Sequence, residues 1–248
     1  MKQNLRVHPL HEELVHAVAD HITAVLRKSV AARGVASLVL SGGSTPRGVY
    51  KVLSMEPFRS IIPWASVHLF WGDERCVPAT GEESNFRMVD EALIRHISIP
   101  PENVHKIPGE RPPAEAALAY ESEIRKFFRL NEREFPQFDL LMLGLGEDGH
   151  TASLFPGTTT LHVHDRIVTD AYVEKLMAHR ITMTLPTINH AAAILFLVEG
   201  RNKAGILRDV LGNQGQPYPA QLVRPVAGEL LWFVDHAAAS QLQTVNHP

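Results

Sequence analysis

The sequence predicts an α/β protein with a mainly parallel sheet that is covered by helices on both faces. Apolar runs of strand length alternate with segments of helical apolar spacing along most of the chain. This order produces parallel strands joined by helical crossovers. Apolar residues make up 45% and charged residues 21% of the 248 residues, as in ordinary globular chains. We therefore predict one domain over residues 1–248, a length that can bury a large core.

The first predicted elements are a long helix, two strands and the helix between them. Apolar residues at helical spacing predict a helix over Glu12–Ala32. The apolar run Ser37–Leu40 predicts a strand that leads into a glycine-rich turn. Pro46 then suits the first turn of a helix that continues through Val49, Tyr50 and Leu53. Val67–Trp71 is the second predicted strand.

The remaining elements continue this alternation. Each predicted strand is a short apolar run, and each helix has apolar residues at helical spacing or begins at a capping residue. They are a helix capped by Ser84 and continuing through Leu93, a helix over Ala114–Leu130, a strand over Phe138–Leu143, a strand over Ile181–Leu185, a strand over Ala192–Val198, a helix over Asn202–Leu211, and a strand over Leu230–Val234 before a short alanine-rich helix.

Composition and charge argue against several classes of partner. The formal net charge is -3, with basic and acidic residues interspersed, so no nucleic-acid binding is expected. The longest apolar run, around Ala191–Val198, is far shorter than the roughly 20 residues of a membrane span, so no membrane association is expected. The N-terminus lacks the apolar core of a signal peptide, and the single cysteine, Cys76, permits no intrachain disulfide. A cytoplasmic protein is therefore expected.

Four polar clusters follow predicted strands. They are Ser41–Thr45, Asp73–Arg75, Gly144–His150 and Glu199–Lys203. Ligands of parallel sheets bind beyond the carboxyl ends of the strands. We therefore expect the clusters to converge on one edge of the sheet and to form the functional site there.

The first cluster has the composition of a phosphate-binding loop. Its two glycines let backbone N–H groups approach an anion, and the following helix directs its positive end to the same place. Two residues with hydroxyl donors come next. The four residues are Gly42, Gly43, Ser44 and Thr45. A tight strand-to-helix turn with a capping hydroxyl is the alternative interpretation.

Other residues near the strand ends suit a phosphorylated, hydroxylated ligand. Arg75 has the fork geometry for a phosphate, and Asp73 suits orienting a catalytic group or binding a hydroxyl, although both also suit a minor surface ion pair. Asn85 is most simply part of a helix cap, with the ligand as its alternative partner. Arg180 is a further cation at the start of a strand. Lys203, in the first turn of its predicted helix, opposes the helix dipole, which is more favourable when an anion lies nearby.

The Gly144–His150 segment contains the pattern G-x-G-x-x-G, which is typical of dinucleotide binding when a long helix follows. Here Pro156 and Gly157 interrupt the chain too early for that helix, so no nucleotide cofactor is expected. An imidazole titrates near neutral pH, so His150 suits general-base work, and Asp148 is close enough to orient it. A structural histidine that bonds the loop backbone is the alternative.

Metal chemistry is not expected. His162 and His164 do not have the spacing of a helical metal site with a supporting carboxylate. Cys76 suits a thiol nucleophile or a small buried residue equally well.

Six segments carry a family pattern in order along nearly the whole chain. They are Leu40–Pro46, Trp71–Pro78, Ser84–Met88, Gly144–Gly157, Thr184–Pro186 and Gly228–Trp232. Together they resemble the glucosamine-6-phosphate isomerase/6-phosphogluconolactonase family. The resemblance implies a modified Rossmann-like fold of the NagB/RpiA/CoA-transferase type, with neither a metal nor a nucleotide cofactor.

The resemblance also implies a reaction. This is the hydrolysis of 6-phospho-D-glucono-1,5-lactone to 6-phospho-D-gluconate, the second step of the oxidative pentose phosphate pathway. Catalysis is implied for His150, with Asp148 and Asp73 near it. The implied phosphate contacts are the Ser41–Thr45 loop, Arg75, Arg180 and Lys203.

Three alternatives stay open at this point. An amino-sugar-phosphate deaminase or isomerase would use the same loop with Asp73 as the base. A non-catalytic sugar-phosphate sensor would bind the ligand without turnover. A nicotinamide-dependent dehydrogenase is the most distant alternative. The oligomeric state is a separate matter: the sequence is compatible with either a monomer or a small homo-oligomer.

Overall fold

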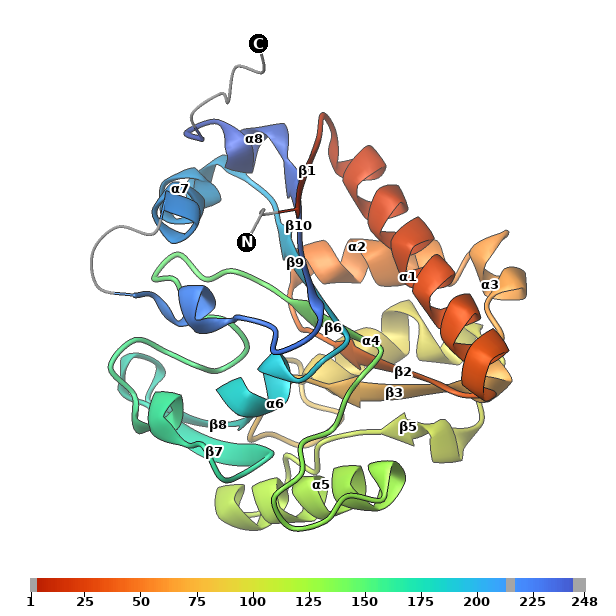
Figure 1. Cartoon of the computed structure of the whole chain (residues 1–248), viewed down its shortest axis with the longest axis vertical. Coiled ribbons are helices and arrows are strands. Elements are labelled where there is room, and N and C mark those ends of the chain that lie inside the picture. The colour runs from red at the N-terminus through yellow and green to blue at the C-terminus, as the bar shows by residue number, and fades with distance from the viewer. Residues whose placement is uncertain (1–3, 213–216, 243–248) are drawn as a thin grey trace.

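A seven-stranded sheet forms the centre of the computed structural model, which describes residues 4–212 and 217–242 (Figure 1). Its strand pairs are parallel, in the order β1-β10-β9-β6-β2-β3-β5. The strands are β1 (Asn4–His8), β2 (Ala36–Leu40), β3 (Val67–Trp71), β5 (Val104–His105), β6 (Leu140–Leu143), β9 (Ala193–Val198) and β10 (Glu229–Asp235). The predicted parallel sheet is confirmed.

Helices cover both faces of this sheet, as predicted. In Figure 1, α1 lies on one side of the sheet and α7 on the other. The helices are α1 (His11–Arg33), α2 (Ser44–Leu53), α3 (Phe58–Ile61), α4 (Asn85–Ala92), α5 (Pro113–Phe128), α6 (Leu185–Asn189), α7 (Ala204–Gly212) and α8 (His236–Ala239). In the described part of the chain, none of them is long and apolar enough to cross a membrane.

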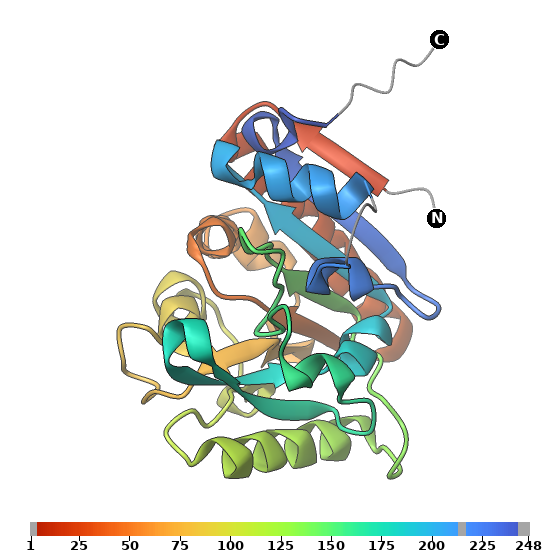
Figure 2. The same cartoon turned by 90° about the vertical axis from the view of Figure 1, so that its left-hand side faces the viewer.

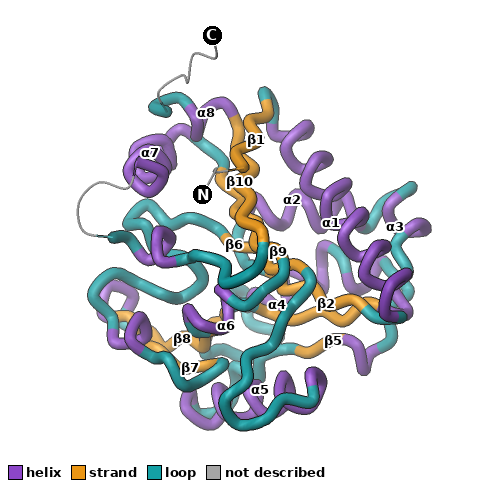
Figure 3. Tube along the Cα trace, in the orientation of Figure 1, coloured by secondary structure: helices purple, strands orange, loops and turns teal. Residues whose placement is uncertain are grey.

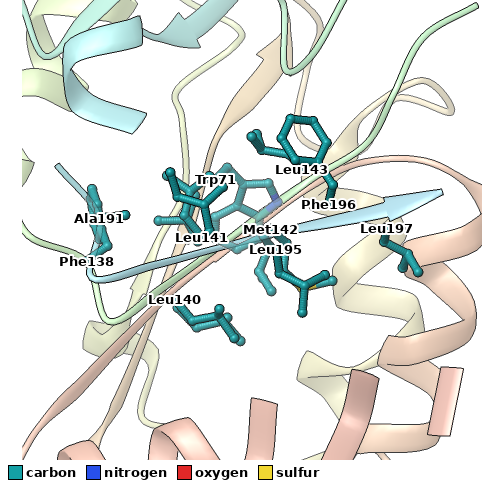
Figure 4. Packing of buried hydrophobic residues seen from close by; sticks show 14 of the residues in the cluster. Trp71, Phe138, Leu140, Leu141, Met142, Leu143, Ala191, Leu195, Phe196 and Leu197 are labelled. Carbon is teal, nitrogen blue, oxygen red and sulfur yellow. The ribbon is translucent and has the colours of Figure 1, made fainter. Parts of the chain in front are cut away.

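The central strands are buried on both faces. Every residue of β2, β6 and β9 is buried, and the large side chains of Trp71, Phe138 and Phe196 pack around them (Figure 4). Phe196 stacks on Trp232 of β10, with ring centroids 4.0 Å apart. Each fully buried large apolar side chain contributes roughly 1.5–3 kcal/mol. The strand ends that carry the polar clusters are therefore held by a densely packed core.

A second sheet contains three antiparallel strands, in the order β4-β8-β7, and the local sequence pattern does not predict it. The strands are β4 (Asp73–Arg75), β7 (Val168–Val173) and β8 (Ala178–Met183). β7 packs against α5 (Figure 2). Because only Gly72 separates β3 from β4, the chain passes directly from the large sheet into the small one.

The predicted strand Ile181–Leu185 is wrong at both ends. β8 begins earlier and stops at Met183, and Leu185 already belongs to α6. The Thr184 hydroxyl accepts a hydrogen bond from the backbone N–H of Thr187, and Pro186 lies in the first turn, where its missing N–H costs nothing. These features start a helix where the apolar run alone suggests a strand.

The connections after β2, β6 and β9 all leave the same edge of the parallel sheet, since these strands are parallel to one another. Figure 3 draws the loops of the chain in teal. That edge is where the sequence places its polar clusters.

Candidate functional site

A cavity of about 460 Å³ lies at this edge, and all four polar clusters contribute to its lining. The predicted site residues that line it are Gly42, Gly43, Asp73, Arg75, Asn85, Asp148, His150, Arg180 and Lys203. Among the described residues, the lining does not include Ser44 or Thr45, which form the first turn of α2. The structure therefore brings together every predicted cluster, but not these two hydroxyl groups.

His150 lies in the cavity with one ring nitrogen held by a carboxylate. Its Nδ1 is 2.5 Å from Oδ1 of Asp148, and its ring stacks on Phe155 with centroids 4.1 Å apart. An ionised carboxylate only accepts hydrogen bonds, so Nδ1 carries the proton and Nε2 keeps its lone pair. The His150 side chain is 30% exposed, so water reaches it. This arrangement suits a general base.

Asp148 has partners on both carboxylate oxygens. Oδ1 also accepts a hydrogen bond from the backbone N–H of His150 at 3.3 Å, and Oδ2 accepts one from Nζ of Lys175 at 3.1 Å. Partial burial raises the pKa of Asp148, but the interactions with His150 and Lys175 outweigh burial and lower this pKa to about 2. Asp148 is therefore ionised at neutral pH and stabilises a protonated His150.

Two glycines leave room for this geometry. A Cβ at Gly146 would lie 2.0 Å from Nδ1 of His150, so a larger residue would displace the ring. Gly149 has a φ of +77°, and a Cβ there would lie 2.4 Å from the ring of Tyr218. Packing around His150 and Tyr218 thus explains two glycines of the G-x-G-x-x-G pattern without a pyrophosphate.

Asp73 has a different partner from Asp148. Its Oδ2 accepts a hydrogen bond from Oγ of Ser153 at 2.6 Å. Of the two candidate aspartates, Asp148 is the one that bonds the imidazole of His150, whereas Asp73, on β4, lines the same cavity and bonds Ser153.

Besides Lys175, three cations line the same cavity. Arg75 of β4 and Arg180 of β8 are paired directly across the small sheet, and Lys203 comes from the segment after β9. Burial, and then the neighbouring charge of Arg75, lower the pKa of Arg180. Like charges this close repel one another unless an anion neutralises them, so the lining favours an anionic ligand.

Lys203 does not lie in the first turn of α7, which corrects the prediction. It is the last residue of the 3₁₀ helix η6 (Arg201–Lys203), and α7 begins one residue later. Gly200, with a φ of +99°, starts this turn, and its N–H donates to Asp235 at 3.1 Å. The turn thereby holds Lys203 at the sheet edge.

A buried carboxylate positions Asn85. Glu74 is 2% exposed, and it accepts hydrogen bonds from the backbone N–H groups of Asn85 and Phe86 at 2.8 and 2.7 Å. Burial raises the pKa of Glu74. The Asn85 side chain donates to the backbone oxygen of Asp73 at 3.0 Å. Its Oδ1 lies so close to Gly42 that a Cβ there would be only 2.0 Å away.

Comparison with known proteins agrees with this geometry. The family described as glucosamine-6-phosphate isomerases/6-phosphogluconolactonase matches residues 9–232. The chain belongs to this family. A 6-phosphogluconolactonase of Synechocystis sp. is 40% identical over 225 residues, which are 90% of this chain and 91% of the relative. The prediction of an enzyme of the glucosamine-6-phosphate isomerase/6-phosphogluconolactonase family is confirmed.

Solved structures in this family confirm the predicted fold type. A 6-phosphogluconolactonase from Trypanosoma cruzi has a TM-score of 0.88 and 29% identity, covering 98% of this chain and 97% of that one. A monomeric glucosamine-6-phosphate deaminase of the NagB superfamily has a TM-score of 0.80, covering 96% and 100% of the two chains. Its identity is 19%, so it shows the shared fold alone.

Several residues that line the cavity are not predicted by the sequence pattern. Lys175 and Leu176 lie in the 3₁₀ helix η5 (Glu174–Leu176) between β7 and β8, and no motif marks this segment. Ser153 lies inside a segment that carries the family resemblance, but only the folded chain shows that it contacts Asp73.

Within residues 4–212 and 217–242, no group of three or more His, Cys, Asp or Glu side chains is placed to hold a metal ion.

The surroundings of Cys76 do not favour a thiol nucleophile. Cys76 packs against the core, and burial raises the pKa of its thiol, which opposes formation of the reactive thiolate. A small packing residue is the better interpretation of Cys76.

Proposed function

We propose that this family member is a 6-phosphogluconolactonase, which hydrolyses 6-phospho-D-glucono-1,5-lactone to 6-phospho-D-gluconate. The proposal depends on one observation. His150, whose Nδ1 bonds the carboxylate of Asp148, lies in the same cavity as three cations, which are Arg75, Arg180 and Lys203. A base and an anion-binding surface within one cavity suit a phosphorylated substrate. The names of the relatives from Synechocystis and Trypanosoma cruzi support the same activity.

In the proposed complex, the substrate phosphate binds the cations of Arg75, Arg180 and Lys203. It also binds the backbone at Gly42 and Gly43. Gly43 is the N-cap of α2 and lines the cavity, so the positive end of this helix dipole faces the ligand. Binding the phosphate away from the reacting carbon positions the lactone carbonyl, which can lower the barrier by several kcal/mol.

In the proposed reaction, Nε2 of His150 takes a proton from water as the water oxygen attacks the lactone carbonyl. Asp148 stabilises the imidazolium that forms. A loop N–H or a cation stabilises the tetrahedral oxyanion. The carbonyl re-forms as the bond to the ring oxygen breaks, and His150 returns its proton to that oxygen. The product is the open-chain acid, and no covalent enzyme intermediate is needed.

A His150→Ala variant tests the role of the base. We expect a fall in kcat of about 100-fold to 10,000-fold, since a positioned general base contributes this much. Binding of 6-phosphogluconate should persist because the cations remain. The measurement is lactone hydrolysis followed by acid release and corrected for spontaneous hydrolysis. His162→Ala, at an exposed position on the 3₁₀ helix Thr159–His162, is the matched control. Unchanged turnover in His150→Ala would reject the mechanism.

A glucosamine-6-phosphate deaminase is the second candidate, because Asp73 lines the same cavity and the family includes such isomerases. Ammonia release from glucosamine 6-phosphate, measured beside lactone hydrolysis on the unmodified protein, separates the two. We expect lactone hydrolysis to dominate. Ligand binding with neither turnover would indicate a sugar-phosphate sensor.

A further inference from the structure

Lys175 reaches the candidate base pair from a distant segment. It lies in η5, between β7 and β8, and its Nζ is 3.1 Å from Oδ2 of Asp148, 27 residues earlier in the chain. Asp148 Oδ1 is occupied by His150. The carboxylate therefore lies between an imidazole and an ammonium group, and its rotation is restricted from both sides.

A role in stability explains this ion pair poorly. The Lys175 side chain is 71% exposed, and exposed ion pairs contribute little to folding because solvent screens them. Lys175 also lines the candidate site itself, together with Leu176. An adjacent cavity of about 730 Å³ shares Asp148, Phe155 and Lys175 with the site, so the pair stands in the wall between the two cavities.

The charge of Lys175 acts on His150 through Asp148. A carboxylate beside an imidazole favours the protonated ring, and a cation on the same carboxylate offsets part of that effect. The other charged groups of the site cavity are Asp73, Arg75, Arg180 and Lys203, and those of the adjacent cavity are Asp170 and Glu174. Among the described residues, Lys175 is the cation bonded to Asp148.

We propose that Lys175 is a positioning residue for the base: it fixes the Asp148 carboxylate against the ring of His150, and its charge offsets part of the stabilisation that this carboxylate gives to the protonated ring. This inference rests on the proposed lactonase reaction for its kinetic consequence, but its effect on the ring is independent of turnover.

The test compares Lys175→Met and Lys175→Gln with Lys175→Arg, which keeps the charge. Without the cation, the pH midpoint of His150 and the acid limb of kcat/KM should both move up by about 0.5 to 1 pH unit, as expected for one charge about two contacts away. Lys175→Arg should leave both the His150 midpoint and the acid limb of kcat/KM as they are in the unmodified protein. Lys28→Met, at an exposed position on α1, is the matched control and should change neither.

The His150 midpoint is read by NMR titration of the imidazole, whose resonance is identified by its absence in His150→Gln. The titration decides the inference even when no lactone is hydrolysed, so failure of the proposed function is recognised separately by absent turnover in the unmodified protein. An unchanged His150 midpoint in Lys175→Met and Lys175→Gln would overturn the inference. An equal loss of rate at every pH, without a shifted limb, would also overturn it.

Discussion

At the scale of single residues, the geometry of the candidate base depends on what neighbouring positions lack. Gly146 has no Cβ, and the His150 ring occupies the space that a Cβ would take. In the same way, the side chain of Asn85 occupies the space that a Cβ of Gly42 would take. Each glycine is therefore required by a close approach, and a methyl group would displace a polar side chain that lines the cavity.

Gly146→Ala should reduce lactone hydrolysis by about 100-fold, because a displacement of about 1 Å at a catalytic group costs this much. The measurement is kcat beside the urea midpoint, which separates a displaced ring from lost stability. Gly205→Ala is the matched control, since the nearest atom that a Cβ there would meet outside its own helix backbone is Oε1 of Gln241, at an ordinary 3.9 Å. Full activity in Gly146→Ala would show that the ring position is not needed.

At the scale of elements, a buried carboxylate organises the start of α4. Glu74 accepts from the backbone N–H groups at the start of that helix, and the Ser84 hydroxyl also donates to it at 3.1 Å. The first turn of a helix leaves backbone N–H groups without acceptors inside the helix. The Glu74 carboxylate supplies acceptors for two of these N–H groups. Ser84 caps α4 as predicted, accepting from the N–H of Arg87.

Glu74→Gln should destabilise the fold by about 1–3 kcal/mol, because an amide NH₂ would face a backbone N–H where an acceptor is required. Activity should fall as well, since Asn85 and Arg75 both lie beside Glu74. Urea unfolding measures the first effect and lactone hydrolysis the second. Glu82→Gln, on the exposed surface nearby, should leave both unchanged. Equal unfolding midpoints for the two variants would contradict this account of Glu74.

At the scale of the whole molecule, the two strands of the large sheet farthest from β1 carry a pair of histidines, of which His105 is buried and His68 is half-buried. Nδ1 of His68 on β3 is 2.8 Å from Nε2 of His105 on β5, and Nδ1 of His105 is 2.6 Å from Glu123. Burial, and then the neighbouring His105, lower the pKa of His68 to about 4. An unfolded histidine titrates near pH 6.5, so the unfolded chain binds more protons between about pH 6.5 and 4.

Stability should therefore fall as the pH falls from about 6.5 to 4, and His68 should contribute nothing further below that window. His68→Gln retains a hydrogen-bonding side chain without the titration, so its urea midpoint should decline less over this range. His162→Gln, at an exposed position, should follow the unmodified protein. Parallel pH profiles for all three proteins would show that His68 does not contribute.

The sequence by itself determined five strands of the large sheet (β2, β3, β6, β9 and β10) and most of the helices between them, the parallel pairing, the edge that holds the site, and the nearness of Asp148 to His150. These features depend on apolar periodicity, on turns, or on residues two positions apart, all of which are local. Only the tertiary structure decided that Ser153 contacts Asp73 across 80 residues, that Lys175 reaches Asp148, and that a small antiparallel sheet aligns Arg75 with Arg180. Strand pairing and hairpin placement depend on contacts between distant segments, whose geometry is set by packing rather than by any local pattern.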